Sequence, residues 1–263
     1  MRTIHDLQQQ SNHGMTLTET RHSEESVVSA PQRVTLFLDG ADLDHMEEAV
    51  RSGMVAGFTT NPTLVAKAGV ENYRDFATEA LARVAGAPIS LEVLADDLPG
   101  IETQAREIAS WGPNVSVKVP VCTTSGESTL EVVRSLTRDG LSVNVTAVMT
   151  MEQVAGVAEV VDPGTLAYVS IFAGRIADTG RDPCPFMREA VDICRHRPNL
   201  KVLWASPREV LNVYQADECG VHVIVLTSDL LAKLSLRNKD LAEYSRETVK
   251  MFYDDAIRAG YTL

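Results

Sequence analysis

From Arg33 onward, short apolar runs alternate with longer stretches in which apolar residues recur at helical spacing. The apolar runs predict eight strands, at residues 34–39, 54–59, 88–94, 114–120, 141–146, 166–172, 200–205 and 221–226. The longer stretches predict nine helices, at residues 42–52, 71–85, 99–110, 127–139, 150–161, 185–196, 207–218, 228–235 and 238–259. This alternation is typical of repeated βα units around a parallel sheet.

The number of units favours a closed barrel over an open sheet. Eight strands with eight following helices in about 230 residues fit a single (β/α)₈ barrel, the TIM-barrel fold. We expect it to span residues 33–263, with residues 238–259 as an extra terminal helix. A doubly wound open sheet is the competing interpretation. No predicted strand is followed by G-x-G-x-x-G or G-x-x-x-x-G-K-[ST], so the usual nucleotide sites of that architecture are missing.

The strands also separate aliphatic from polar side chains. In the third predicted strand, Ile89, Leu91 and Val93 occupy one phase. Ser90 and Glu92 occupy the other phase, which in a barrel points to the centre. The residues predicted to point inward near the carboxyl ends of their strands, where barrel active sites lie, are Asp39, Glu92, Lys118, Asn144, Thr146 and Ser170. Each alone also fits a structural role, but together they would leave several buried charges without a purpose.

Lys118 lies in an apolar strand, Asn114–Val121, where a lysine has no evident structural reason to be. Desolvation among valines favours the neutral amine, the form that attacks a carbonyl to make a Schiff base. An edge-strand lysine that reaches solvent is the alternative. A lumen that holds an amine, two acids and several hydroxyl or amide groups fits imine chemistry, because an acid can remove the carbinolamine hydroxyl and the imine then serves as an electron sink.

Two arginines follow neighbouring strands at matched positions. Phe172-Ala-Gly-Arg175 comes after the sixth predicted strand, and Ala205-Ser-Pro-Arg208 comes after the seventh. Two guanidinium groups, the Ser206 hydroxyl and a helix N-terminus form a common phosphate site on this face of a barrel. Either arginine alone also fits a surface ion pair.

The composition limits the partners. A net charge of −12 and a pI near 4.9 argue against nucleic acid and anionic membranes, both of which need basic surface. The four cysteines form no C-x-x-C pair, so we expect reduced thiols and no metal or cofactor. No secretory signal or membrane span is recognisable, which makes the cytoplasm the expected location. Residues 1–32, with His5, His13 and His22, are polar and without apolar periodicity, which predicts a flexible, solvated N-terminal extension.

Six segments in a fixed order resemble the transaldolase family of Schiff-base-forming aldolases. The matching segments are Leu36-Phe-Leu-Asp-Gly-Ala-Asp42, Gly57-Phe-Thr-Thr-Asn-Pro-Thr-Leu64, Val117-Lys-Val-Pro120, Val143-Asn-Val-Thr146, Tyr168-Val-Ser-Ile-Phe-Ala-Gly-Arg175 and Leu203-Trp-Ala-Ser-Pro-Arg208. The resemblance implies a (β/α)₈ barrel without a cofactor, sugar-phosphate substrates and assembly into a homo-oligomer. It also implies that Lys118 forms the imine.

The resemblance assigns further roles position by position. Asp39 would take the proton from the C4 hydroxyl, and Glu92 with Thr146 would position a water for proton shuttling. The candidate substrate-binding residues are Thr60, Asn61, Asn144, Ser170, Phe172, Arg175, Ser206 and Arg208. Among these, Ser206, Arg175 and Arg208 resemble the phosphate-binding group, while Asn61 and Asn144 resemble the amides that hold the three-carbon unit.

Two positions favour transfer of a dihydroxyacetone unit to an aldose phosphate over simple cleavage. The fructose-6-phosphate aldolase branch carries glutamine and tyrosine where this chain has Glu92 and Phe172. Departures from the family pattern at Val148-Met149 and Pro207 predict a pocket of different shape. Aldolase-type cleavage, a specialised transaldolase for a longer or modified sugar such as an octulose phosphate, a non-catalytic sugar-phosphate-binding barrel and a phosphate-binding isomerase in which Lys118 is a point charge remain alternatives.

Overall fold

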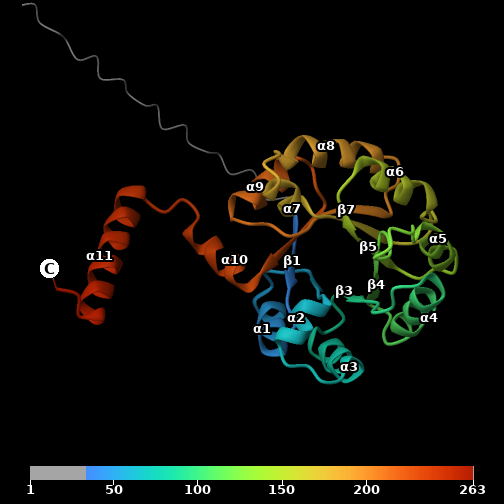
Figure 1. Ribbon diagram of the computed structural model, residues 1–263, viewed down its shortest axis with the longest axis horizontal. Helices are drawn as coiled ribbons and strands as arrows, with labels where there is room; N and C mark the ends of the chain where they lie inside the picture. The colour runs from blue at the N-terminus through green and yellow to red at the C-terminus, as the bar shows by residue number, and fades with distance from the viewer. Residues whose placement is uncertain (1–33, 263) are drawn as a thin grey trace, which may run out of the picture. The chain divides into compact units, whose positions relative to one another are not determined.

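A computed structural model describes residues 34–262 and shows eight parallel strands closed into a barrel in sequence order, with β1 paired to β8 (Figure 1). The strands are β1 (Thr35–Asp39), β2 (Gly57–Thr59), β3 (Ile89–Glu92), β4 (Val115–Pro120), β5 (Val143–Val148), β6 (Ala167–Ile171), β7 (Leu200–Trp204) and β8 (Val223–Thr227). The predicted barrel is confirmed and the open sheet is excluded. The prediction of a flexible extension falls on residues 1–32, which lie outside the described residues.

Helices surround the barrel, as Figure 1 shows. The helices of the described residues are α1 (Leu43–Ser52), α2 (Pro62–Lys67), α3 (Tyr73–Arg83), α4 (Leu98–Ala109), α5 (Leu130–Arg138), α6 (Met151–Val160), α7 (Ala173–Asp178), α8 (Pro183–Cys194), α9 (Leu211–Glu218), α10 (Ser228–Lys233) and α11 (Leu241–Ala259), with a short 3₁₀ turn at Leu234–Leu236. All nine predicted helices are present. The sequence pattern missed α2 and α7, because six residues are too few to show helical periodicity.

Local signals explain where several helices begin. The Thr150 side chain accepts a hydrogen bond from the Gln153 amide, and the Gln153 side chain accepts one from Thr150 in return. This reciprocal capping box starts α6 directly after β5. The Asn61 side chain caps α2 by accepting a hydrogen bond from the Leu64 amide, with Pro62 in the first helical position. The chain therefore turns from strand to helix within two or three residues at the carboxyl end of the barrel.

Two apolar clusters form the core, one between the strands and the helices and one inside the barrel. The aliphatic phase of the strands, for example Val117, Val145 and Val169, is fully buried beneath the helices. A second cluster lies inside the barrel and includes Phe37 and Tyr168, whose ring centroids are 5.9 Å apart. The lower lumen is thus largely packed with apolar side chains, as expected for an eight-stranded barrel, although Thr35 and Lys201 lie at its opposite end and Ser116 bonds to Ser142.

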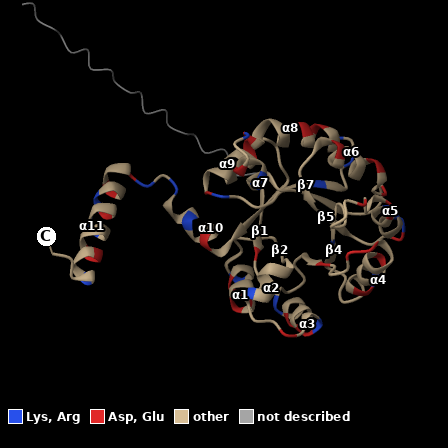
Figure 2. Ribbon diagram, viewed as in Figure 1, with Lys and Arg blue, Asp and Glu red and all other residues tan. Residues whose placement is uncertain are grey.

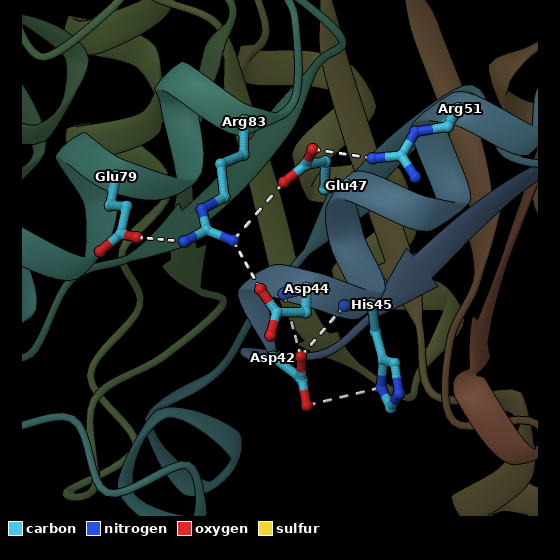
Figure 3. A network of polar contacts seen from close by, with 7 residues as sticks. All are labelled: Asp42, Asp44, His45, Glu47, Arg51, Glu79 and Arg83. Carbon is cyan, nitrogen blue, oxygen red and sulfur yellow. Dashed lines mark hydrogen bonds and ion pairs between the residues drawn. The ribbon is translucent and has the colours of Figure 1, made fainter.

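Lys, Arg, Asp and Glu residues lie largely on the outer helices (Figure 2). On one side, Arg83 of α3 contacts Asp44 and Glu47 of α1 and Glu79 of its own helix, while Arg51 pairs with Glu47 (Figure 3). Exposed ion pairs of this kind contribute little individually, so the network orients α1 against α3 more than it stabilises the fold.

The terminal helix α11 is amphipathic but has no buried residue. Its exposed apolar side chains include Leu241, Val249, Phe252 and Ile257, each at least 63% exposed. Within the described chain, no other element covers these side chains. No helix among residues 34–262 is long and apolar enough to cross a membrane.

Candidate active site

A cavity of about 580 Å³ opens at the carboxyl ends of the strands. Every strand contributes a residue to its lining, namely Asp39, Thr59, Glu92, Lys118, Thr146, Ser170, Leu203 and Thr227. A second cavity, of about 660 Å³, lies at the opposite end of the barrel and contains none of the predicted site residues. The position of the first cavity is where active sites of this fold occur.

Lys118 points into the lumen and is only 6% exposed. Its Nζ lies 3.1 Å from the Glu92 Oε2 and donates a hydrogen bond of 2.9 Å to the backbone carbonyl of Thr60. The alternative of a lysine that reaches solvent is therefore wrong. When the amine is neutral, these two acceptors engage its two hydrogens and its lone pair is left for a third direction, which is the geometry that a nucleophilic amine needs.

Asp39 ends β1 at the floor of the same cavity. The Thr59 hydroxyl donates a hydrogen bond of 2.8 Å to Asp39 Oδ1. Burial raises the pKa of Asp39, and the Lys118 charge and the Thr59 hydrogen bond offset this only in part. A carboxyl group with a raised pKa in a closed site is suited to accept and return a proton during a reaction.

Strand β5 is irregular next to the site. Its pairing with β6 shifts register between Val145 and Val148, and Ala147 has φ of 60°, a left-handed conformation that is uncommon outside glycine. The bulge leaves the buried Thr146 hydroxyl without a hydrogen-bond partner among the described residues. Thr146 also lines the cavity, so this hydroxyl is available to a ligand or water there.

Two of the candidate substrate-binding residues lie behind the cavity wall. The Asn144 Nδ2 donates to Ser90 Oγ at 2.9 Å, and Ser170 Oγ donates to Asn144 Oδ1 at 2.6 Å. Thr60 is fully buried, and its hydroxyl has no partner among the described residues. Neither Asn144 nor Thr60 belongs to the cavity lining, so Thr60 serves the site through its carbonyl.

Asn61 and Ser170 do line the cavity. The Asn61 Oδ1 is occupied as the cap of α2, where it accepts from the Leu64 amide at 3.0 Å. Its side-chain nitrogen makes no described bond and is left as a donor. Phe172 lies beside them and carries the Arg175 guanidinium 5.7 Å from its ring centroid.

The rim of the cavity brings Arg175, Ser206 and Arg208 together, as the anion-site prediction requires. Arg208 is also paired with Asp178, through Nε to Oδ1 at 3.0 Å and through Nη2 to the second oxygen. The Arg208 hydrogen bond lowers the pKa of Asp178, so this carboxylate is charged at neutral pH. Asp178 therefore holds the Arg208 fork in a fixed orientation beside the rim.

Gly174 is essential to this arrangement. A Cβ atom at position 174 would lie 1.6 Å from the backbone oxygen of Ser206 and 2.7 Å from its carbonyl carbon. Ser206 itself adopts φ of 59°. Strain of this kind persists only where the surrounding structure enforces it, and here it brings the Ser206 loop against the start of α7.

Residues that the sequence reasoning did not single out also shape the site. Thr59 binds Asp39, Ser90 binds Asn144 and Asp178 binds Arg208. Ser90 shares the inward phase of Glu92, which is a usable signal. Tyr73, at the start of α3, lies in no strand, so strand alternation gives no signal for it. Its hydroxyl nevertheless accepts a 2.9 Å hydrogen bond from the Glu92 amide.

Of the three residues that depart from the family pattern, Val148, Met149 and Pro207, only one lines the cavity. Pro207 lines the cavity. Val148 does not, because the bulge in β5 turns it outward into the aliphatic core, where it is fully buried. Met149 is 39% exposed and is not part of the lining. Among residues 34–262, no three His, Cys, Asp or Glu side chains are grouped to hold a metal ion.

The fold and the site together define a (β/α)₈ barrel with a buried lysine between carboxylates at its carboxyl-end cavity. Residues 36–262 match the family described as transaldolase/fructose-6-phosphate aldolase, and the chain belongs to that family of aldolase and transaldolase enzymes.

Similar proteins agree with this assignment. A probable transaldolase of Heliobacterium modesticaldum is 35% identical over 199 residues, which cover 75% of this chain and 88% of that protein. A probable transaldolase of Desulforamulus reducens is 32% identical over 222 residues, covering 82% and 97%. The crystal structure of KGPDC from Streptococcus mutans shares the fold with a TM-score of 0.51 at 10% identity, covering 74% of this chain and 88% of that one.

Proposed function

We propose that the protein is a transaldolase that transfers a dihydroxyacetone unit from a ketose phosphate to an aldose phosphate through a Schiff base on Lys118. The observation that carries the proposal is the environment of the Lys118 amine, which is buried, held by the Thr60 carbonyl and Glu92, and shares one cavity with Asp39. An amine with fixed hydrogen-bond acceptors and two nearby carboxyl groups has what imine formation and aldol cleavage require.

In the proposed reaction, the Lys118 amine attacks the C2 carbonyl of the donor and forms a carbinolamine. A water held by Glu92 and Thr146 delivers a proton to its hydroxyl, which leaves as water and gives the iminium. Asp39 then removes the C4 hydroxyl proton as the C3–C4 bond breaks, and the bond electrons pass to the iminium to form an enamine. The aldehyde product leaves, and an acceptor aldehyde reverses these steps. The unpaired Thr146 hydroxyl and the raised pKa of Asp39 support these assignments.

The donor's phosphate would lie at the rim with Arg175, Ser206 and Arg208. Support comes from the position of two guanidinium groups and a hydroxyl on one edge of the cavity. The lysine, carboxyl groups and arginines retained in one cavity speak against a non-catalytic barrel. The cavity of about 580 Å³ is large enough for a phosphorylated sugar.

The first experiment is borohydride reduction in the presence of fructose 6-phosphate, read by peptide mass spectrometry. A stable three-carbon adduct is expected on Lys118 in the parent protein and none in Lys118→Met. Lys67→Met is the matched control, because Lys67 lines the same cavity from α2 and should not affect trapping. An adduct that forms on Lys67, or no adduct with any ketose phosphate, contradicts the proposal.

A second experiment separates transfer from cleavage by measuring free dihydroxyacetone with and without an aldose phosphate acceptor. Phe172 in the lining and the carboxylate of Glu92 favour transfer, because a phenyl ring offers the enamine no proton and keeps water away. Little dihydroxyacetone is expected without acceptor. Appreciable release would instead favour fructose-6-phosphate aldolase activity, and a panel of hexulose, heptulose and octulose phosphates would reveal a specialised donor preference.

The proposal includes a homo-oligomer in the cytoplasm. The exposed apolar side chains of α11 support self-association, since a helix with such a face is normally covered. The four unpaired cysteines are what a reducing compartment maintains. Light scattering of the purified protein measures the first part, and a monomer at micromolar concentration would contradict it.

A further inference from the structure

The ladder of backbone hydrogen bonds between β2 and β3 is interrupted beside the candidate active site. The Phe58 amide donates to the Pro88 carbonyl at 2.8 Å, and the Thr60 amide donates to the Ser90 carbonyl at 3.1 Å. In a parallel ladder the next bond of this series would join the Glu92 amide to the Thr60 carbonyl. Instead, the Glu92 amide donates to the Tyr73 hydroxyl at 2.9 Å.

Because the Glu92 amide bonds to Tyr73, the Thr60 carbonyl receives no hydrogen bond from β3. That carbonyl accepts the 2.9 Å hydrogen bond from Lys118 Nζ. The interruption of the ladder thus leaves the Thr60 carbonyl as one acceptor for Lys118. The other acceptor is the side chain of Glu92, the residue whose amide bonds to Tyr73. The Tyr73 hydroxyl of α3 consequently determines the hydrogen-bond partners of the Glu92 amide and the Thr60 carbonyl, both beside the Lys118 amine.

Tyr73 is fixed in place by its own surroundings. Its ring packs against Phe76, with centroids 6.4 Å apart, and edge-on against Trp111 at 6.0 Å. Burial raises the pKa of Tyr73 to about 12, which the hydrogen bond from Glu92 offsets in part. The phenol is therefore protonated at every pH at which the protein is studied, and its oxygen is a constant neutral acceptor for the Glu92 amide.

We propose that Tyr73 is a positioning residue for Lys118: by accepting the Glu92 amide hydrogen bond it keeps the Thr60 carbonyl free to orient the Lys118 amine. The consequence for catalysis rests on the proposed function of Lys118. Without the hydroxyl, the part-buried Glu92 amide loses its own acceptor and is paired only part of the time, when it displaces Lys118 from the Thr60 carbonyl, the acceptor that the ladder would ordinarily supply. The Lys118 amine then competes for that carbonyl and loses its fixed direction.

The test compares Tyr73→Phe with Trp111→Phe. The first removes only the hydroxyl, whereas the second disturbs the same aromatic cluster and leaves the hydrogen bond in place. For Tyr73→Phe, we expect the saturating rate of borohydride-trapped adduct formation on Lys118 to fall about tenfold, the effect of one hydrogen bond. The donor concentration at half-saturation should stay unchanged, because the phosphate end is untouched. Trp111→Phe should keep the parental trapping rate and the parental half-saturating concentration, although its melting temperature falls more than that of Tyr73→Phe.

Two readouts do not depend on a sugar substrate. Amide hydrogen exchange at Glu92 should be faster in Tyr73→Phe than in the parent protein and unchanged in Trp111→Phe. Reductive methylation of Lys118 by formaldehyde and cyanoborohydride should slow in Tyr73→Phe alone. If the parent protein forms no adduct with any ketose phosphate, the proposed function fails, and these two measurements still decide the role of Tyr73.

The inference is overturned if exchange at Glu92 is the same in Tyr73→Phe and the parent protein. It is also overturned if exchange becomes faster while Lys118 methylation and trapping stay at parental rates, because the hydrogen bond would then serve the fold alone.

Discussion

Asp39 illustrates, at the scale of a single residue, how burial disfavours the charged form of a carboxyl group. Its carboxyl group is buried, and the raised pKa means that the folded chain binds the Asp39 proton more tightly than the unfolded chain does. The stability that this group contributes is therefore full below the ordinary aspartate pKa and is lost as the pH rises through the raised value. Above the raised pKa, the charged and buried Asp39 carboxylate lowers the free energy of unfolding.

Replacing Asp39 with asparagine should make the protein more stable and less active. Asn keeps an oxygen for the Thr59 hydroxyl but removes the charge. We expect a melting temperature higher by roughly 2–4 °C at pH 8, with the difference shrinking toward pH 4. Turnover should fall by about 10²–10⁴-fold while the Lys118 adduct still forms. Thermal scans across pH measure the first effect, and near-normal turnover would show that Asp39 is not the acid or base.

Substitution of Arg208 tests the proposed phosphate site at the rim of the cavity. Its fork binds Asp178 through two nitrogens, a geometry that lysine cannot reproduce. Arg208→Lys should raise the KM for fructose 6-phosphate by about 10–100-fold and leave kcat nearly unchanged. With unphosphorylated fructose as donor, the variant and the parent protein should have equal KM values. Equal losses for both donors would place Arg208 outside the phosphate site.

At the scale of elements, the start of α7 and the loop after β7 act as one unit, since the Ser206 backbone lies against Gly174. Gly174→Ala cannot be accommodated by a side-chain adjustment, because the nearest atoms belong to the backbone. We expect a loss of about 1–3 kcal/mol in the free energy of unfolding and a higher KM for the phosphorylated donor. Gly40→Ala is the control, because a Cβ there meets no atom within 4 Å. Similar unfolding midpoints for the two variants in urea would contradict this interpretation.

The elements also show what the sequence can and cannot predict. Alternation of aliphatic and polar residues was sufficient to place all eight strands and to send Asp39, Glu92 and Lys118 into one cavity. It did not reveal the end of β5, where the extra residue of a bulge resets the phase between Thr146 and Val148. A bulge depends on pairing with the neighbouring strand, which a single strand's pattern does not contain.

The contacts of Tyr73 and Asp178 illustrate the same limit within the site. Both residues lie on helices, Tyr73 in α3 and Asp178 in α7, and each reaches a group that comes from a different part of the chain. Their side-chain types are ordinary for helix surfaces, so no local signal separates them from solvated neighbours. Such positions become visible only when the strands and helices are assembled.

At the scale of the whole molecule, closing the barrel buries three of the four thiols. Cys184, Cys194 and Cys219 are buried, whereas Cys122, in the loop after β4, is half-buried. Burial, as the largest cause, raises the pKa of Cys184 to about 12 and that of Cys194 to about 11, which suppresses the reactive thiolate.

We therefore expect one thiol to react quickly with an aromatic disulfide reagent at pH 8 and three to react only on unfolding. Cys122→Ser should remove the fast phase, and Cys194→Ser should leave it intact. A fast phase that survives Cys122→Ser would mean that α8 or α9 opens in the native state.

The placement of the two tryptophans has an optical consequence. Trp204 is fully buried at the end of β7, directly before Ala205 and Ser206 of the rim, and Trp111 touches Tyr73 on the far side of the barrel wall. Each indole therefore senses a different end of the site. In a Trp111→Phe background the ultraviolet emission would follow occupation of the rim, and in a Trp204→Phe background it would follow the environment of Tyr73. The two tryptophans are thus intrinsic fluorescent reporters, with which the proposed binding of a sugar phosphate and an adjustment at Lys118 should be timed separately without attaching a label.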